Sequence, residues 1–191
     1  MKNDRLRILL RWQATREKVI ETIKRKGWVW LNFIPENQDG PSEWIWLIDP
    51  EHTFHYIEDA FHGLRYVIFQ GPDKNKIAAH LVSELEHFDS SDILRLWDNA
   101  SNLQVKIEAA NALGVGAPIE PDSEFIKRIT EGFFHSDSNV RYAAVLAAAY
   151  TQWDNFLSLF EQLSQNDPVD EIRTAASNIQ NAYSYYSNQE Q

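Results

Sequence analysis

The chain has 191 residues, which is long enough to bury a hydrophobic core without cross-links. It has no cysteine, so disulfides, thiol nucleophiles and thiolate metal sites are excluded. Its formal net charge is −10 at pH 7, and residues 1–27 carry +6 of charge while the remainder carries −16. An acidic body repels phosphate backbones, which disfavours nucleic acid as a partner and favours a basic protein, although acidic surfaces also serve solubility alone.

Helical spacing of apolar residues predicts a first helix over residues 3–26, with Gly27 as its stop. The other face of this helix holds basic residues that include Arg7, Arg11 and Lys18. A solvated face with partly buried aliphatic stems is the favoured interpretation. Contact with an anionic surface or membrane is the alternative, and it would make the protein a surface-associated adaptor.

Aromatic and β-branched residues predict an antiparallel strand pair at residues 28–34 and 43–48. A helix over 51–62 and a third strand over 64–70 complete a small α-β-β-α-β unit that ends at Pro72. Four tryptophans lie in the first two strands: Trp28, Trp30, Trp44 and Trp46. They are expected to protect the end of a helical array or to form a binding face, and the cap is favoured.

The rest of the chain has helical periodicity. Helices are predicted over residues 75–88, 92–97, 103–113, 121–134, 139–150, 153–163 and 171–183. No run approaches the ~20 apolar residues of a membrane span, and the N-terminus lacks the apolar stretch of a signal peptide, so the expected location is cytoplasmic.

Three of these helices share one sequence motif, which we call the phrase. In it, an aliphatic residue is followed by a basic residue and then by paired alanines. The aliphatic positions Val105, Val140 and Ile172 are 35 and 32 residues apart, a period typical of two-helix solenoid units. The basic residues are Lys106, Arg141 and Arg173, and the pairs are Ala109-Ala110, Ala143-Ala144 and Ala175-Ala176. Small residues allow close helix packing, and each basic residue is expected to pair with an acid of an adjacent turn or unit.

This phrase resembles the second helix of HEAT-like repeats, over roughly residues 73–183. The resemblance implies a mainly α fold: a HEAT-like α-solenoid of short antiparallel helix pairs in residues 73–191, preceded by a small α/β capping unit in residues 1–72. HEAT-like families are mainly scaffolds and protein-binding adaptors, with minorities that bind nucleic acid or act as bilin lyases. No catalytic residue of those lyases has a counterpart here.

The expected function is therefore a non-catalytic protein-binding module for a basic partner. An immunity or antitoxin protein against a basic nuclease is a narrower version, which charge and size alone suggest. The candidate groove consists of outward residues on the helices predicted at 121–134 and 153–163: Glu124, Lys127, Arg128, Glu131, Asn155, Ser158, Glu161 and Gln162. The acids of this groove would steer a basic ligand, so affinity should fall with salt.

An enzyme or chromophore-handling protein of the bilin-lyase type is the alternative class, with Trp and Tyr lining an apolar pocket. Two sets of His and acidic residues have helical spacing: Glu51, His55, Glu58, Asp59 and His62, and then His80, Glu84 and His87. Solvated helix faces explain both sets better than metal sites do, because neither contains a defining ligand motif. No metal, no cofactor and no catalytic residue is expected.

Overall fold

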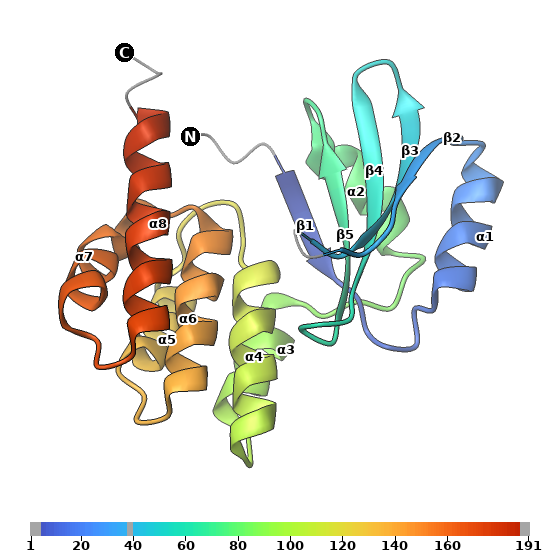
Figure 1. Ribbon diagram of the computed structural model, residues 1–191. Coiled ribbons are helices and arrows are strands. Elements are labelled where there is room, and N and C mark those ends of the chain that lie inside the picture. The colour runs from blue at the N-terminus through green and yellow to red at the C-terminus, as the bar shows by residue number, and fades with distance from the viewer. Residues whose placement is uncertain (1–4, 38–39, 188–191) are drawn as a thin grey trace. The chain divides into compact units, whose positions relative to one another are not determined.

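The computed structural model describes residues 5–37 and 40–187, and it divides into two compact units between Ser90 and Ser91 (Figure 1). The fold is mixed α/β, with an antiparallel sheet in the first unit and helices in the second. The sequence places the boundary at residue 72, but the helix that follows packs on the sheet and belongs to the first unit.

The sheet unit contains five strands and two helices. They are β1 (Arg5–Leu9), α1 (Arg16–Lys26), β2 (Val29–Ile34), β3 (Ser42–Asp49), β4 (His52–Asp59), β5 (Leu64–Gln70) and α2 (Lys74–Val82). The strand order is β1-β5-β4-β3-β2, and all neighbours are antiparallel. The predicted pairing of residues 28–34 with 43–48 and the strand at 64–70 are confirmed.

The predicted helix over residues 3–26 is wrong in its first half, because residues 5–9 form β1 and pair with β5. Leu6 and Ile8 point toward the core of the unit, so the segment alternates as a strand does. The helix begins only after Thr15, whose hydroxyl accepts the Lys18 N–H, and it ends as predicted at Gly27, which has a φ of 74°. The proposed basic helix face is therefore not formed, since Arg7 and Arg11 lie outside α1.

The predicted helix over residues 51–62 is wrong as well, because most of it forms β4 in the middle of the sheet. Phe54 and Tyr56 lie in the helix-covered core, whereas His55 between them faces the other side. Phe61, which the helical interpretation would bury, is 85% exposed in the turn before β5. The predicted α-β-β-α-β order is thereby corrected to β-α-β-β-β-β-α.

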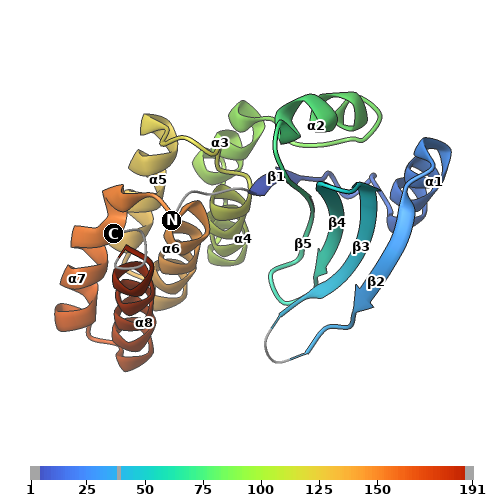
Figure 2. The same cartoon turned by 90° about the horizontal axis from the view of Figure 1, so that it is seen from above.

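Both helices of this unit pack on the same face of the sheet (Figure 2). Val19 and Ile23 of α1 and Ala78 and Leu81 of α2 join the buried strand residues in one cluster. Phe54, Tyr56, Val67 and Phe69 supply its centre from β4 and β5. The edge strand β2 contributes least to burial, because all six of its residues are exposed.

The helical unit has six α-helices among its described residues. They are α3 (Ser90–Asp98), α4 (Leu103–Val115), α5 (Ser123–Phe133), α6 (Ser138–Thr151), α7 (Leu157–Asn166) and α8 (Asp170–Ser187), with a short 3₁₀ turn, η1 (Asp154–Phe156), before α7. Each predicted helix of this region is present, with ends that differ by a few residues. Asn102, Asp122 and Asp137 cap the N-termini of α4, α5 and α6.

The three helices that carry the phrase stack on one another: α4 packs along α6, and α6 packs against α8. The other helices lie in a second row, α3, α5 and α7, on one side of the first (Figure 2). Small residues permit the close approach of the two rows and of their members. A Cβ on Gly114 of α4 would collide with the Ala147 backbone of α6, and one on Gly132 of α5 would collide with Ala144.

Candidate binding surface of the helical unit

The eight predicted site residues fall on two segments of the helical unit, α5 and the continuous stretch of η1 and α7. Glu124, Lys127, Arg128 and Glu131 lie on α5, and Asn155, Ser158, Glu161 and Gln162 lie on η1 and α7. The two segments are neighbours, since the Phe133 ring of α5 lies 6.0 Å from that of Phe156 and 5.8 Å from that of Phe160. Of the α5 residues, Glu124, Arg128 and Glu131 bond to other side chains of the unit, whereas the four exposed residues on η1 and α7 take part in no ion pair among the described residues.

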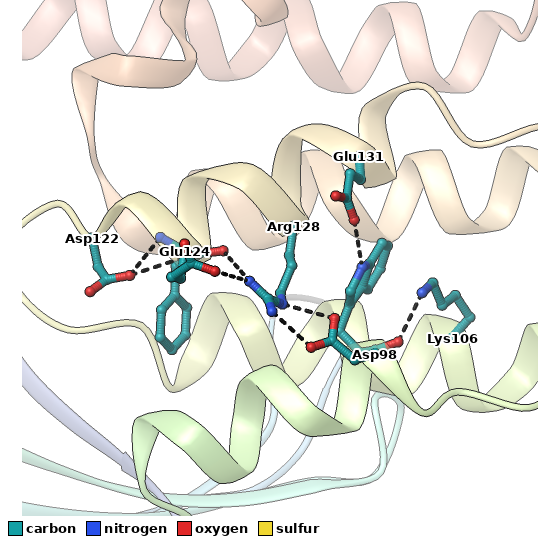
Figure 3. Close-up of polar contacts among 8 residues, drawn as sticks. Asp98, Lys106, Asp122, Glu124, Arg128 and Glu131 are labelled. Atoms are coloured by element: carbon teal, nitrogen blue, oxygen red, sulfur yellow. Dashed lines mark hydrogen bonds and ion pairs between the residues drawn. The ribbon is translucent and has the colours of Figure 1, made fainter.

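Arg128 joins α5 to α3 rather than facing solvent freely (Figure 3). Its Nε and Nη2 donate to the two carboxylate oxygens of Asp98 at 2.9 and 2.7 Å, and its Nη1 donates to Glu124 at 2.7 Å. These bonds raise the pKa of Arg128 and lower that of Asp98. A bidentate pair of this kind fixes geometry, so Arg128 holds two helices together.

Trp97 of α3 is a second link between α3 and α5, and it also contacts α4. Its indole N–H donates to Glu131 of α5 at 3.1 Å, and its ring lies 3.6 Å from the Lys106 Nζ of α4. Burial lowers the pKa of Lys106, opposed by the nearby charges of Glu131 and Asp98. Glu131 therefore serves packing, although part of its side chain remains exposed.

The basic residue of each phrase has a common structural partner. It donates to backbone carbonyls at or beyond the end of the helix before it. Lys106 donates to Trp97 O at 2.9 Å, Arg141 to His135 O and Ser136 O at 3.1 Å, and Arg173 to Asp167 O at 2.6 Å. Carbonyls at a helix C-terminus lack intrahelical partners, so a cation there supplies hydrogen bonds and favourable charge.

The expected pairing of these basic residues with acids is confirmed for two of the three. Arg141 and Asp167 form a buried bidentate pair, with distances of 2.8 and 3.0 Å and side chains that are only 11% and 2% exposed. The pairing raises the pKa of Arg141 and lowers that of Asp167. Arg173 pairs with Asp170 in its own first turn, whereas Lys106 has no carboxylate within ion-pair distance among the described residues.

These contacts leave the helical unit with unbalanced negative charge. Residues 91–191 contain six Lys or Arg and 14 Asp or Glu, a net charge of −8. Five of the six bases bond to carboxylates or carbonyls inside the unit: Arg95, Lys106, Arg128, Arg141 and Arg173. Among the residues that the structure describes, the exposed acids Glu120, Asp154, Glu161 and Glu171 take part in no ion pair. The exposed charge of the unit is therefore mainly acidic.

The most open part of the predicted groove is one stripe along η1 and α7. We call it the α7 stripe, and its members are Asp154, Asn155, Ser158, Glu161 and Gln162. All five residues are exposed, while Phe156, Phe160 and Leu163 bury the opposite side of the same segment. The stripe has two carboxylates, and neither η1 nor α7 contains a basic residue. Asp154 was missing from the predicted site, although its spacing of four residues from Ser158 could have placed it there.

Three of the four tryptophans of the predicted strand pair, Trp28, Trp44 and Trp46, pack in the core of the sheet unit. Trp46 is buried, and Trp28 lies 5.2 Å from Phe54 between ring centroids. Trp44 packs beside Tyr56, while Trp30, half exposed on β2, packs edge-on against Trp46. The proposal that these rings cap a helical array stays a prediction.

Three histidines on β4 and in the turn after it each have a local acidic partner. His55 lies 2.5 Å from Glu43 on the neighbouring strand, His62 lies 2.7 Å from Asp59, and His52 lies 2.6 Å from Asp49. The helical spacing that grouped Glu51 with His62 is absent, because residues 52–59 are a strand. In residues 5–37 and 40–187, no group of three or more His, Asp or Glu is arranged to hold a metal ion.

The sequence interpretation missed Asp98 and Trp97, the α3 partners of the predicted site residues Arg128 and Glu131. Asp98 and Arg128 are 30 residues apart, and Trp97 and Glu131 are 34 apart. These separations are close to the period of the phrase, so that period was the signal that could have paired them.

No helix of the described residues is long and apolar enough to cross a membrane. Comparisons of the chain with protein-family models, with curated proteins and with solved structures found no match.

Proposed function

We propose that the helical unit is a non-catalytic protein-binding module of HEAT-like architecture that recognises a basic protein through the α7 stripe. The observation that carries this proposal is the excess of exposed acidic side chains over exposed basic side chains in the helical unit. Five of the six bases of the unit form bonds between or within helices, while four exposed acids take part in no ion pair among the described residues. A surface of that kind attracts cationic ligands and repels nucleic acid.

The arrangement of the helices supports a repeat architecture. Three helices with the same phrase stack in order, and the basic residue of each phrase binds carbonyls at the same relative place. Repeat arrays present one row of helices as an extended surface, which suits them to binding rather than to catalysis. The α7 stripe lies on such a row, and its five residues are exposed.

The α7 stripe is favoured over the α5 part of the original groove. Arg128 and Glu131 already hold α3 and Trp97, so a ligand there would have to replace formed bonds. On the α7 stripe, Asp154 and Glu161 offer carboxylates that are hydrated in the free protein. Such exposed acids influence the association rate and its salt dependence more than they add affinity.

The test is a peptide array probed with the full-length purified protein. The array carries Lys/Arg-rich, neutral and acidic peptides of matched length, and we expect enrichment of the Lys/Arg-rich set. The double variant Asp154→Asn/Glu161→Gln should weaken the best basic peptide by roughly two- to thirty-fold, the range for two exposed ion pairs.

A matched control makes the same change in net charge in the sheet unit. Glu51→Gln/Glu86→Gln removes two exposed carboxylates there and should leave the affinity nearly unchanged. Equal losses in the two double variants would show attraction by net charge alone. Equal binding of basic and neutral peptides would contradict the proposal.

A further inference from the structure

The edge strand β2 is open, apolar and uncharged. Val29, Trp30, Leu31, Phe33 and Ile34 are 60, 50, 47, 41 and 37% exposed. Among the described strands only β3 pairs with it, so its outer side is open to a further strand, although the Phe33 N–H donates to the Asn32 side chain. Soluble proteins usually protect such an edge with charge, proline or a β-bulge. The segment VWLNFI has no charge and no proline, and its pairing with β3 shifts register between Trp30 and Asn32.

Charges at the two ends of β2 have opposite signs. Helix α1 ends in the basic run Lys24, Arg25 and Lys26 just before the strand, and Glu36 follows the strand. Arg25 and Lys26 already pair with Glu84, whereas Lys24 is exposed and has no ion pair among the described residues. An antiparallel partner of the same sequence would place its Glu36 end beside the basic end of this strand. A parallel partner would place like charges together.

We propose that β2 pairs antiparallel with β2 of a second copy of this chain, which joins the two sheets edge to edge in a two-fold symmetric dimer. The pairing supplies hydrogen-bond partners for the outer backbone groups of both strands. It also buries the apolar residues of both edges against each other. The sign change along the strand favours a second copy over an arbitrary extended peptide, because symmetry makes each basic end meet an acidic end.

The test is sedimentation equilibrium of the full-length protein from about 1 to 100 µM, a range that brackets a micromolar dimer, at near-physiological salt. The wild-type protein is expected to show a concentration-dependent dimer. Leu31→Lys puts a charge near the two-fold axis, close to its symmetric copy, and should raise the dimer dissociation constant by on the order of tenfold or more. Phe61→Lys introduces the same charge at an apolar position that is 85% exposed away from β2, and it should change nothing.

A second pair of variants tests the antiparallel direction and does not perturb the strand. Glu36→Lys should raise the dissociation constant by roughly two- to thirty-fold, because two symmetric ion pairs are lost. The double charge reversal Lys24→Glu/Glu36→Lys should return the dissociation constant to the wild-type value. Three results would each overturn the proposal. They are a wild-type protein that is monomeric at every concentration, equal effects of Leu31→Lys and Phe61→Lys on the dissociation constant, or no effect of Glu36→Lys on it. Far-UV circular dichroism checks that every variant is folded.

Discussion

Replacing Arg141 by Met should destabilise the helical unit more than any other single change at a basic residue of the phrase. The substitution keeps an apolar stem but removes a guanidinium that makes four hydrogen bonds, two to Asp167 and two to backbone carbonyls. Asp167 would be left 95% buried, with the Val169 N–H still donating to its carboxylate. Leaving one buried partner unpaired costs about 3–5 kcal/mol in free energy of unfolding.

Arg173 offers a matched comparison, because it occupies the equivalent position of the next phrase. Its carboxylate partner, Asp170, is 87% exposed, and its other bond is to the Asp167 carbonyl. Arg173→Met should therefore cost only about 1–2 kcal/mol. Urea unfolding followed by circular dichroism at the helical band measures both values. Equal losses in the two variants would refute the argument that burial of the Asp167 carboxylate sets the difference.

The same pair predicts a pH dependence. Arg141 holds the pKa of Asp167 below its ordinary value of 3.8, so the unfolded state takes up a proton first as the pH falls. The stabilisation is complete above the unfolded pKa and is lost as the pH falls through the lower folded pKa. The free energy of unfolding of the helical unit should decline on acidification below about pH 4. That decline should be smaller in Arg141→Met, whereas an identical acid profile would contradict it.

Further predictions concern packing and a histidine. Gly114→Ala should cost about 1–3 kcal/mol or more in free energy of unfolding, because the new Cβ collides with the Ala147 backbone. Gly40→Ala is the control, because the space around Gly40 is open. Equal shifts of the thermal unfolding midpoint in the two variants would disprove the close approach of α4 and α6. Bonding to Asp49 and to the Pro72 carbonyl raises the pKa of His52. The stability that His52 contributes should be present below about pH 6.5 and lost as the pH rises through its folded pKa. His52→Gln should flatten this dependence in denaturant titrations between about pH 5 and 8, and an unchanged dependence would exclude His52 as its source.

The helices of the second unit could be predicted because local signals agree there with packing. Phrases such as NLQVKIEAA combine an N-cap, an apolar stripe and small residues, and each of the three forms the helix expected of it. The same phrase also indicated that its helices pack on one another, as α4 and α6 do. Local propensity and tertiary contacts favour one structure in such segments.

Two strands of the sheet unit were misassigned as helices, because the spacing of their apolar residues fits both a helix and a strand. Leu6, Leu9 and Leu10 match a helical stripe, but pairing with β5 makes residues 5–9 a strand. Phe54, Ile57 and Phe61 likewise match a helix, although the β-branched and aromatic residues of HTFHYIED favour a strand. Tertiary pairing decided both cases, which periodicity in a short segment cannot anticipate.

The candidate surface was predictable only in part, for a similar reason. Exposure of Glu161 and its neighbours follows from the apolar stripe of α7. Arg128 forms an ion pair with Asp98, which lies in another helix. The two residues meet only because α3 and α5 are neighbours in the fold. A sequence shows which face of a helix is polar, but the helix that covers that face is set by the fold.

The most direct test of the central claim is a salt titration of the best basic peptide from the array, measured by fluorescence anisotropy. If the α7 stripe recognises a basic protein, the affinity of the wild-type chain should fall steadily as ionic strength rises from about 0.05 to 0.5 M. Asp154→Asn/Glu161→Gln should show both weaker binding and a shallower salt dependence, while Glu51→Gln/Glu86→Gln should follow the wild type. An affinity indifferent to salt, or an equal slope in all three proteins, would contradict the assignment of the site.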